Sequence, residues 1–304
     1  MDKVMSDKKA VVIFLLPSFI LFCAVIIIPI FMSAGYSLTE WDGTRAKVFI
    51  GLQNYKELFS SPVFLKSMLN SLIIAVASVL IQLPLSLLLA LCIAHGVKGE
   101  KFFITVFFIP VILASVVIGQ LWARIYNQNG LLNLFLRALG DKDAKTAWLG
   151  GMKTALPAVI VPILWQYVGY HMLLFYSGIR SISQDIFEAA KIDGASFWRT
   201  CSSITIPLLK PIIEVSVTFA VVGSMKTYDL VKVLTNGGPA SASEVITTLL
   251  VRTMFYPGNR YGYGSAMAIA LIAECFLLYL ALGRIFREKP EKLEKPLKDE
   301  RSAA

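Results

Sequence analysis

The sequence predicts an all-α membrane protein with six transmembrane helices, and three observations support this fold class. The chain of 304 residues is 56% hydrophobic and has a mean hydropathy of +0.68, a combination that ordinary globular domains do not show. It contains six apolar runs of about 20 residues or more, the length that an α-helix needs to cross a bilayer. Polar segments separate these runs, which cover residues 11–34, 67–94, 102–123, 155–178, 208–231 and 263–286.

The first run follows Lys3, Lys8 and Lys9, so a secretory signal peptide must be considered. Its apolar stretch is too long for the core of a typical signal peptide, and it lacks a clear cleavage site between small residues. We therefore interpret it as a retained first span that follows a short cytoplasmic tail, residues 1–10.

Prolines lie within or at the ends of several runs, including Pro29, Pro84, Pro110 and Pro162. A proline inside a helix of a soluble protein usually kinks or ends it. In a membrane bundle, neighbouring helices and water satisfy the carbonyl that the proline leaves free. We therefore keep each run as one predicted span.

The six runs place both termini on the same side of the membrane. Seven of the 29 Lys and Arg residues lie between residues 284 and 301, a bias that is typical of a cytoplasmic flank. This bias also accounts for the net charge of +9 better than binding to nucleic acid does. Residues 287–304 carry mixed charge and two prolines, so we expect a solvated cytoplasmic tail.

The polar stretch between the fourth and fifth runs predicts a short helical hairpin. Ser183 is a suitable N-cap for its first helix. Asp193-Gly194 suits the end of that helix, since glycine adopts the left-handed conformation readily. Ser196 can cap a second short helix, which Pro207 is expected to end.

The first helix of this hairpin carries Ala189 and Ala190 on the same face as Ile186, at helical spacing. Small exposed side chains allow another backbone to approach closely, so we predict a docking element. An interfacial amphipathic helix is the alternative, but such helices usually have more Lys and Arg and larger apolar residues.

The hairpin resembles the EAA loop of ATP-binding-cassette (ABC) import permeases. The matching residues are Glu188, Ala189, Ala190, Gly194, Ile204 and Pro207. Three further segments, residues 36–59, 234–239 and 261–268, resemble the sugar permeases of the maltose and glycerol-phosphate uptake branch. The matches follow the order of that branch over nearly the whole chain.

This resemblance implies a type I ABC importer permease fold over residues 11–286, with a coupling loop at about residues 179–211. It implies a multi-pass protein of the cell membrane whose loop and termini face the cytoplasm. It also implies that ATPase subunits dock onto the loop, through Glu188, Ala189, Ala190, Asp193 and Gly194.

Polar side chains inside predicted spans are costly in lipid, which makes them candidates for a binding site. A sugar offers many hydroxyl groups and apolar C–H faces, so it suits hydrogen-bonding side chains beside aromatic rings. The fourth and fifth spans supply this mixture, and the resemblance implies a translocation pocket in the same region. The candidate substrate-binding residues are Tyr170, Gln166, Ser224, Lys226, Thr227 and Tyr228.

Four ionisable side chains in the fourth, fifth and sixth spans have alternative interpretations. Lys226 stands where amide side chains are common in the relatives, a departure that would suit an acidic sugar. Alternatively, Lys226 and Asp229, three residues apart on one helix, neutralise each other or reach lipid headgroups. We expect a packed, neutral His171, and for Glu274 a protonated or paired structural role, with a proton path as the alternative.

The sequence contains no GxxxxGK[ST] phosphate loop, catalytic triad or metal-ligand pattern, so we expect neither an enzyme nor a cofactor site. ATP and Mg²⁺ are expected on partner subunits. The resemblance implies two copies of a cytoplasmic ATPase, a second homologous permease, an extracytoplasmic solute-binding protein and a sugar substrate.

Two alternatives stay open at this point. One is an ABC permease for a non-sugar solute. The other is an ion-coupled secondary transporter that uses Lys226, Asp229 and Glu274. The inverted repeats and paired broken helices that would favour the second alternative are not visible in the sequence.

Overall fold

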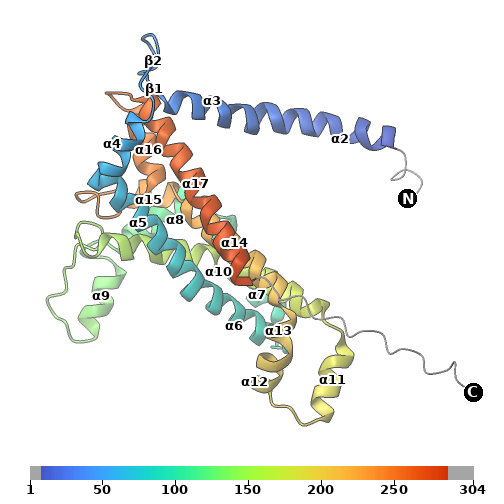
Figure 1. Cartoon of the computed structure of the whole chain (residues 1–304). Coiled ribbons are helices and arrows are strands. Elements are labelled where there is room, and N and C mark those ends of the chain that lie inside the picture. Colours follow the sequence, from blue (N-terminus) through green and yellow to red (C-terminus); the bar gives the residue numbers. More distant parts are fainter. Residues whose placement is uncertain (1–7, 287–304) are drawn as a thin grey trace, which may run out of the picture.

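The computed structural model describes residues 8–286, and helices form nearly all of its regular structure (Figure 1). The strands in this range are one short antiparallel pair, β1 (Thr39–Glu40) with β2 (Val48–Phe49). The predicted all-α fold class is therefore confirmed. The predicted C-terminal tail, residues 287–304, lies outside the described residues, as do residues 1–7.

Within the described range, four helices are long and apolar enough to cross a membrane by themselves. The first comprises α2 (Lys8–Phe22), the π-helical turn η1 (Cys23–Ile27) and α3 (Ile28–Ser37). The second comprises α5 (Pro62–Ala77), the π-helical turn η2 (Ser78–Gln82) and α6 (Leu83–Ala94). The remaining two are α10 (Ala155–Ser181) and α17 (Tyr261–Phe286). These helices correspond to the first, second, fourth and sixth predicted spans.

The third predicted span is broken. α7 (Glu100–Ile112) and α8 (Ser115–Ile125) meet at an angle of 98°, so the expectation of one unbroken helix is wrong. Pro110 weakens the last turn of α7 because it has no N–H to donate. The Gln166 amide of α10 binds the Leu113 carbonyl at the break (3.4 Å), which satisfies an acceptor that a continuous helix would have used.

The fifth predicted span is broken twice, so the expectation of a continuous helix is wrong here too. A bend of 72° precedes α14 (Lys210–Met225), and Lys226–Tyr228 then separate α14 from α15 (Asp229–Leu234). The Thr247 hydroxyl donates to the Thr227 carbonyl at this second break. If each bent pair counts as one span, the described residues contain six spans, the predicted number.

The segment before the bend consists of α12 (Phe197–Thr200), the π-helical turn η3 (Cys201–Thr205) and α13 (Ile206–Leu208). Each π-helical turn in the described range precedes a proline in the next helix, Pro29, Pro84 or Pro207. A proline ring clashes with the carbonyl four residues earlier, and in each case that residue lies in the π-helical turn. The wider turn accommodates the ring. Pro207 therefore does not end the helix, contrary to the prediction.

α10 lies at the centre of the bundle and packs against α6, α7 and α14. At one end its Met172 and Phe175 join a buried cluster with residues of α6 and α14. Towards the other end Val159 and Ile163 join a second cluster with residues of α8 and α15. Burying a side chain of this size contributes roughly 1.5–3 kcal/mol, so α10 fixes the relative positions of the helices around it.

The first span packs differently from the other helices. In the described chain, none of its most apolar 18-residue window is buried. Its α3 segment contacts α17 and β1, and Figure 1 shows α2 leading away from the remaining helices.

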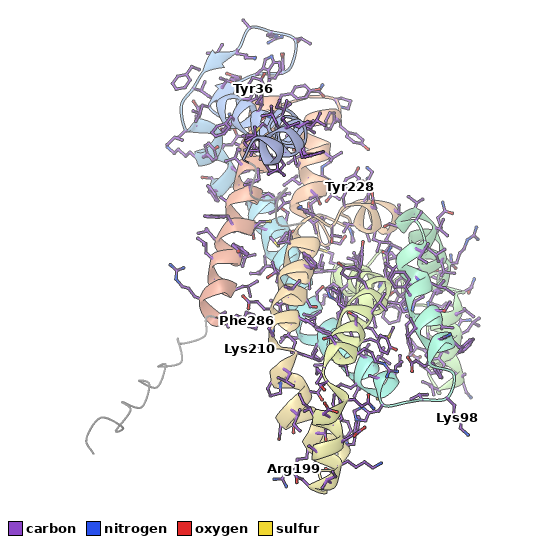
Figure 2. The ribbon with its side chains drawn as sticks, turned by 90° about the vertical axis from the view of Figure 1, so that its right-hand side faces the viewer. Tyr36, Lys98, Arg199, Lys210, Tyr228 and Phe286 are labelled. Atoms are coloured by element: carbon purple, nitrogen blue, oxygen red, sulfur yellow. The ribbon has the colours of Figure 1, made fainter. Side chains whose placement is uncertain are left out.

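Three shorter helices lie in the segments between the predicted spans. These are α4 (Gln53–Ser60), α9 (Leu131–Ala138) and α16 (Ile246–Phe255). Beside α16, the fully buried Glu244 pairs with Arg252 (2.7 Å) and accepts a hydrogen bond from Thr248 (2.6 Å). This pair was not predicted from the sequence. Figure 2 shows Tyr36 at one end of the molecule, Lys98 and Arg199 at the other, and Tyr228 between them.

Candidate functional site

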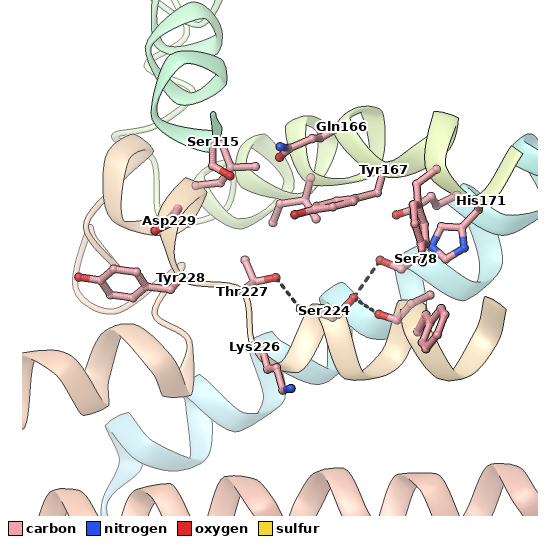
Figure 3. Close-up of a pocket in the computed structure, with 17 residues that line it drawn as sticks. Ser78, Ser115, Gln166, Tyr167, His171, Ser224, Lys226, Thr227, Tyr228 and Asp229 are labelled. Atoms are coloured by element: carbon pink, nitrogen blue, oxygen red, sulfur yellow. Dashed lines mark hydrogen bonds between the residues drawn. The ribbon is translucent and has the colours of Figure 1, made fainter. Parts of the chain in front are cut away.

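A pocket of about 430 Å³ lies between α10 and α14 and reaches both broken spans (Figure 3). Its wall also includes residues of η2, α8 and α15. The six side chains that the sequence identified as candidate substrate ligands all line this one pocket, namely Tyr170, Gln166, Ser224, Lys226, Thr227 and Tyr228. Residues that lie up to 62 positions apart, from Gln166 to Tyr228, are thus brought together.

Sequence reasoning missed several polar residues of the wall. These are Ser78, Gln82, Ser115 and Tyr167. Pro84 is the available signal for the first two, because the π-helical turn that it requires spans Ser78–Gln82. Nothing in the sequence marks Ser115 in the same way, because its position depends on the sharp break after α7.

Ser224 joins the two helices on one side of the pocket. Its Oγ donates to the Ala220 carbonyl (2.7 Å) and lies 3.0 Å from the Oγ of Ser78. Both side chains are almost completely buried. Ser224 therefore contributes mainly to the position of α14 against the second span, with its remaining hydrogen-bonding capacity at the pocket wall.

Gln166 and His171 present buried polar atoms to the pocket. Each residue is only 3% exposed. Gln166 Oε1 and His171 Nδ1 have no hydrogen-bond partner among residues 8–286. An unsatisfied buried polar atom costs about 1–3 kcal/mol, and both residues line the pocket.

Lys226 and Asp229 lie on opposite sides of the break between α14 and α15. The earlier alternative placed them on one continuous helix, and that premise is wrong, because Lys226–Tyr228 are not helical. No ion pair joins the two in the described structure, where every pair within 4.0 Å involves other residues. Figure 3 shows the Lys226 side chain pointing away from Gln166 and Tyr167.

The pocket can therefore hydrogen-bond and stack at the same time. Tyr167, Tyr170 and Tyr228 offer rings and hydroxyl groups, while Gln166 and Asp229 add an amide and a carboxylate. Such a combination suits a ligand with hydroxyl groups and apolar faces.

The hairpin follows the C-terminal end of α10, and Figure 2 shows its Arg199 far from Tyr228 of the pocket. Ser183 caps α11 (Gln184–Ile192) by accepting a hydrogen bond from the Asp185 amide, and Ser196 caps α12 through the Arg199 amide. Gly194 ends α11 with φ +71°, a conformation that other residues adopt at a cost. These three local predictions are confirmed.

The predicted docking face is only partly exposed. Glu188, Ala189, Asp193 and Gly194 are exposed, whereas Ala190 is 6% exposed. The prediction that both alanines are available to a partner is therefore wrong for Ala190. The reason is the fold of the hairpin, because the chain returns after Gly194 and the Ala195 amide binds the Ala190 carbonyl (2.9 Å).

Apolar side chains extend the exposed surface of the hairpin. Ile192 is 86% exposed and Trp198 is 65% exposed. Neither residue was predicted as part of the docking surface. We call the exposed set Glu188, Ala189, Ile192, Asp193 and Trp198 the hairpin tip.

Comparison with known proteins identifies the family. The family of binding-protein-dependent transport system inner membrane components matches residues 10–289. The chain belongs to this family. As an inner-membrane permease component, it has the fold that the sequence predicted.

Relatives and solved structures agree with this assignment. A probable ABC transporter permease protein, YurN of Bacillus subtilis, is 36% identical over 94% of this chain and 99% of its own length. The diacetylchitobiose uptake permease NgcF of Streptomyces coelicolor is 31% identical over 83% of this chain and 75% of its own. A bacterial ABC transporter involved in the import of the acidic polysaccharide alginate has the same fold, with a TM-score of 0.80 and 22% identity. The match covers 95% of this chain and 99% of that chain.

Family membership also decides between the two classes of transporter. The structure contains two broken spans, although the sequence suggested that there were none. Such breaks are common in secondary transporters, so geometry alone does not exclude that class. The family assignment, over almost the whole chain, favours the binding-protein-dependent permease.

Proposed function

We propose that this permease is one half of the translocation pathway of an ATP-driven carbohydrate importer. One observation carries this proposal. A polar, aromatic pocket lies midway along the bundle, and its central helix, α10, continues into an exposed hairpin at one end. A binding site and a docking site on one helix are what coupled transport requires.

The substrate class follows from the pocket chemistry together with the relatives. Tyr167, Tyr170 and Tyr228 can stack on sugar faces, while Gln166, Thr227 and Asp229 can hydrogen-bond to hydroxyl groups. Several related permeases are named for the uptake of sugars, including that for diacetylchitobiose. Lys226 is the candidate for a contact with an acidic sugar, although it points away from the pocket centre in this structure.

The remaining parts of the importer are partners. A dimer of cytoplasmic ATPase subunits would bind ATP and Mg²⁺ and dock at Glu188–Gly194, which places both termini in the cytoplasm. A second permease would complete the pathway and cover the unpacked first span. An extracytoplasmic binding protein would deliver the sugar at the opposite end, beside α4 and α16.

The mechanism is an alternation between two states of the bundle. Closure of the ATPase dimer moves the hairpin, α10 moves with it, and the pocket opens to the other side of the membrane. Hydrolysis resets the complex. The ATPase can shift this equilibrium only to the extent that it binds one state more tightly than the other.

The test is a reconstituted complex of both permeases and the ATPase in proteoliposomes, with the binding protein added outside. ATP hydrolysis is measured with maltose, diacetylchitobiose and an alginate oligosaccharide, and with phosphate and amino acids as non-sugar controls. We expect at least one sugar to stimulate hydrolysis and to accumulate inside. Stimulation by the non-sugar solutes alone would contradict the substrate class. Uptake that needs an ion gradient and no ATP would contradict the whole proposal.

A further inference from the structure

α7 and α10 contact each other at three levels, and the level next to the hairpin is a polar cluster. It comprises Glu100, the first residue of α7, with Tyr176 and Arg180 near the end of α10. The Tyr176 hydroxyl donates to Glu100 Oε1, and Arg180 donates to the Tyr176 hydroxyl (3.0 Å) and to Glu100 Oε2 (2.7 Å). We call these three residues the inner clamp.

Helix ends strengthen the inner clamp. The carboxylate of Glu100 lies at the positive N-terminal end of α7, and the guanidinium of Arg180 lies at the negative C-terminal end of α10. Each charge therefore also stabilises the helix that carries it, through the helix dipole. The side chains are 26% and 48% exposed, respectively. Ion pairs this exposed add little to overall stability. Their main effect here is to fix two helix ends relative to each other.

At the other two levels the helices are also in direct contact. At Gly169 the backbones touch, because an added Cβ would overlap the carbonyl oxygen of Phe107. Nearer the middle of the bundle, the Gln166 amide binds the Leu113 carbonyl at the break between α7 and α8. Gln166 and its neighbour Tyr167 also line the pocket.

We propose that the inner clamp makes α7 and α10 one rigid unit that carries the movement of the hairpin to the pocket. The hairpin helix is capped by Ser183, two residues after α10 ends at Ser181. A displacement of the hairpin therefore acts first on the end of α10 that the clamp holds. Without the clamp, α10 can slip past α7 at this end, and less of the displacement reaches the pocket. This inference rests on the proposed docking role of the hairpin.

The test measures how strongly the state of the ATPase changes access to the pocket, without any sugar. The reporter is Ser115→Cys, in a chain whose four native cysteines are replaced by alanine, within the reconstituted complex. The labelling rate with a membrane-impermeant maleimide is compared between nucleotide-free complex and complex trapped with Mg-ATP and vanadate. The clamp variants are Glu100→Gln and Tyr176→Phe. Lys101→Gln is the matched control, because it removes a charge beside the clamp without touching it.

We expect the clamp variants to lower the ratio of the two labelling rates about three- to tenfold, the size of effect that losing one ordinary hydrogen bond produces, since partial exposure weakens the contribution of the charges. Lys101→Gln should keep the ratio. The exchanged pair Glu100→Arg with Arg180→Glu should recover part of the ratio that Glu100→Arg alone loses, and only part because the exchanged charges oppose both helix dipoles. Complex yield and thermal midpoint are recorded for each variant, since a purely structural role would alter these and leave the ratio unchanged.

The result that overturns the inference is a parental ratio in both clamp variants while Gly194→Val abolishes it. If Gly194→Val also keeps the parental ratio, the docking role of the hairpin fails, and the clamp inference falls with it. The two failures are therefore distinguishable in one experiment.

Discussion

Gly194→Val is the most direct test of the hairpin as the docking site. Gly194 has φ +71°, and a Cβ at this position would meet no atom of the described chain within 4 Å. The cost of a side chain is therefore conformational, not steric. A β-branched residue in the left-handed region costs about 2 kcal/mol, equivalent to a roughly 30-fold shift from the native turn.

The assay compares Gly194→Val with Gly194→Asn, since asparagine tolerates the left-handed conformation. Co-purification with the ATPase and ATP-driven uptake are measured in the reconstituted complex. We expect valine to lower uptake at least about tenfold, and asparagine to lower it less than about threefold. Both variants should insert normally, because the hairpin lies outside the spans. Equal uptake by the two variants would refute the reasoning, since only valine disfavours the turn strongly.

Three further predictions concern charged residues. Hydrogen bonds from Arg260 lower the pKa of Glu57 in the folded protein, so the charged carboxylate stabilises the fold at neutral pH, and this stabilisation is lost as pH falls through that lowered pKa. Glu57→Gln should therefore cost up to about 1 kcal/mol at pH 7, measured by thermal unfolding, and less as the pH is lowered. Arg252→Gln leaves the fully buried Glu244 carboxylate without its counter-charge and should destabilise the permease by about 2–4 kcal/mol, and an unchanged midpoint would count against the pair. Lys226→Gln should lower the stimulation of ATP hydrolysis by acidic sugars relative to neutral ones, and equal effects on both would remove Lys226 from substrate choice.

Local chemistry made the hairpin predictable. Ser183, Ser196 and Gly194 act through the backbone within a few residues of themselves, so their roles can be read from their neighbours in sequence. The burial of Ala190 could not be read in this way. It depends on the return of the chain after Gly194, which brings Ala195 back against the first helix.

The breaks after α7 and after α14 could not be predicted, because the carbonyl left free at each is satisfied by a residue far away in sequence. The Leu113 carbonyl is satisfied by Gln166, and the Thr227 carbonyl is satisfied by Thr247. Apolar composition favours a continuous helix over both segments. A break is tolerated in the membrane because these tertiary hydrogen bonds satisfy the carbonyl groups that it leaves free. The pocket composition was nevertheless partly predictable, since polar residues within apolar runs mark it.

The first span has a consequence for how the subunit is assembled. The helices around α10 bury their side chains against one another, whereas the most apolar part of the first span buries none in its own chain. The residues that pack the bundle and the residues left to contact a second permease are therefore two different sets. A truncation before α3 would test this separation, leaving a correctly folded bundle that no longer recruits the second permease.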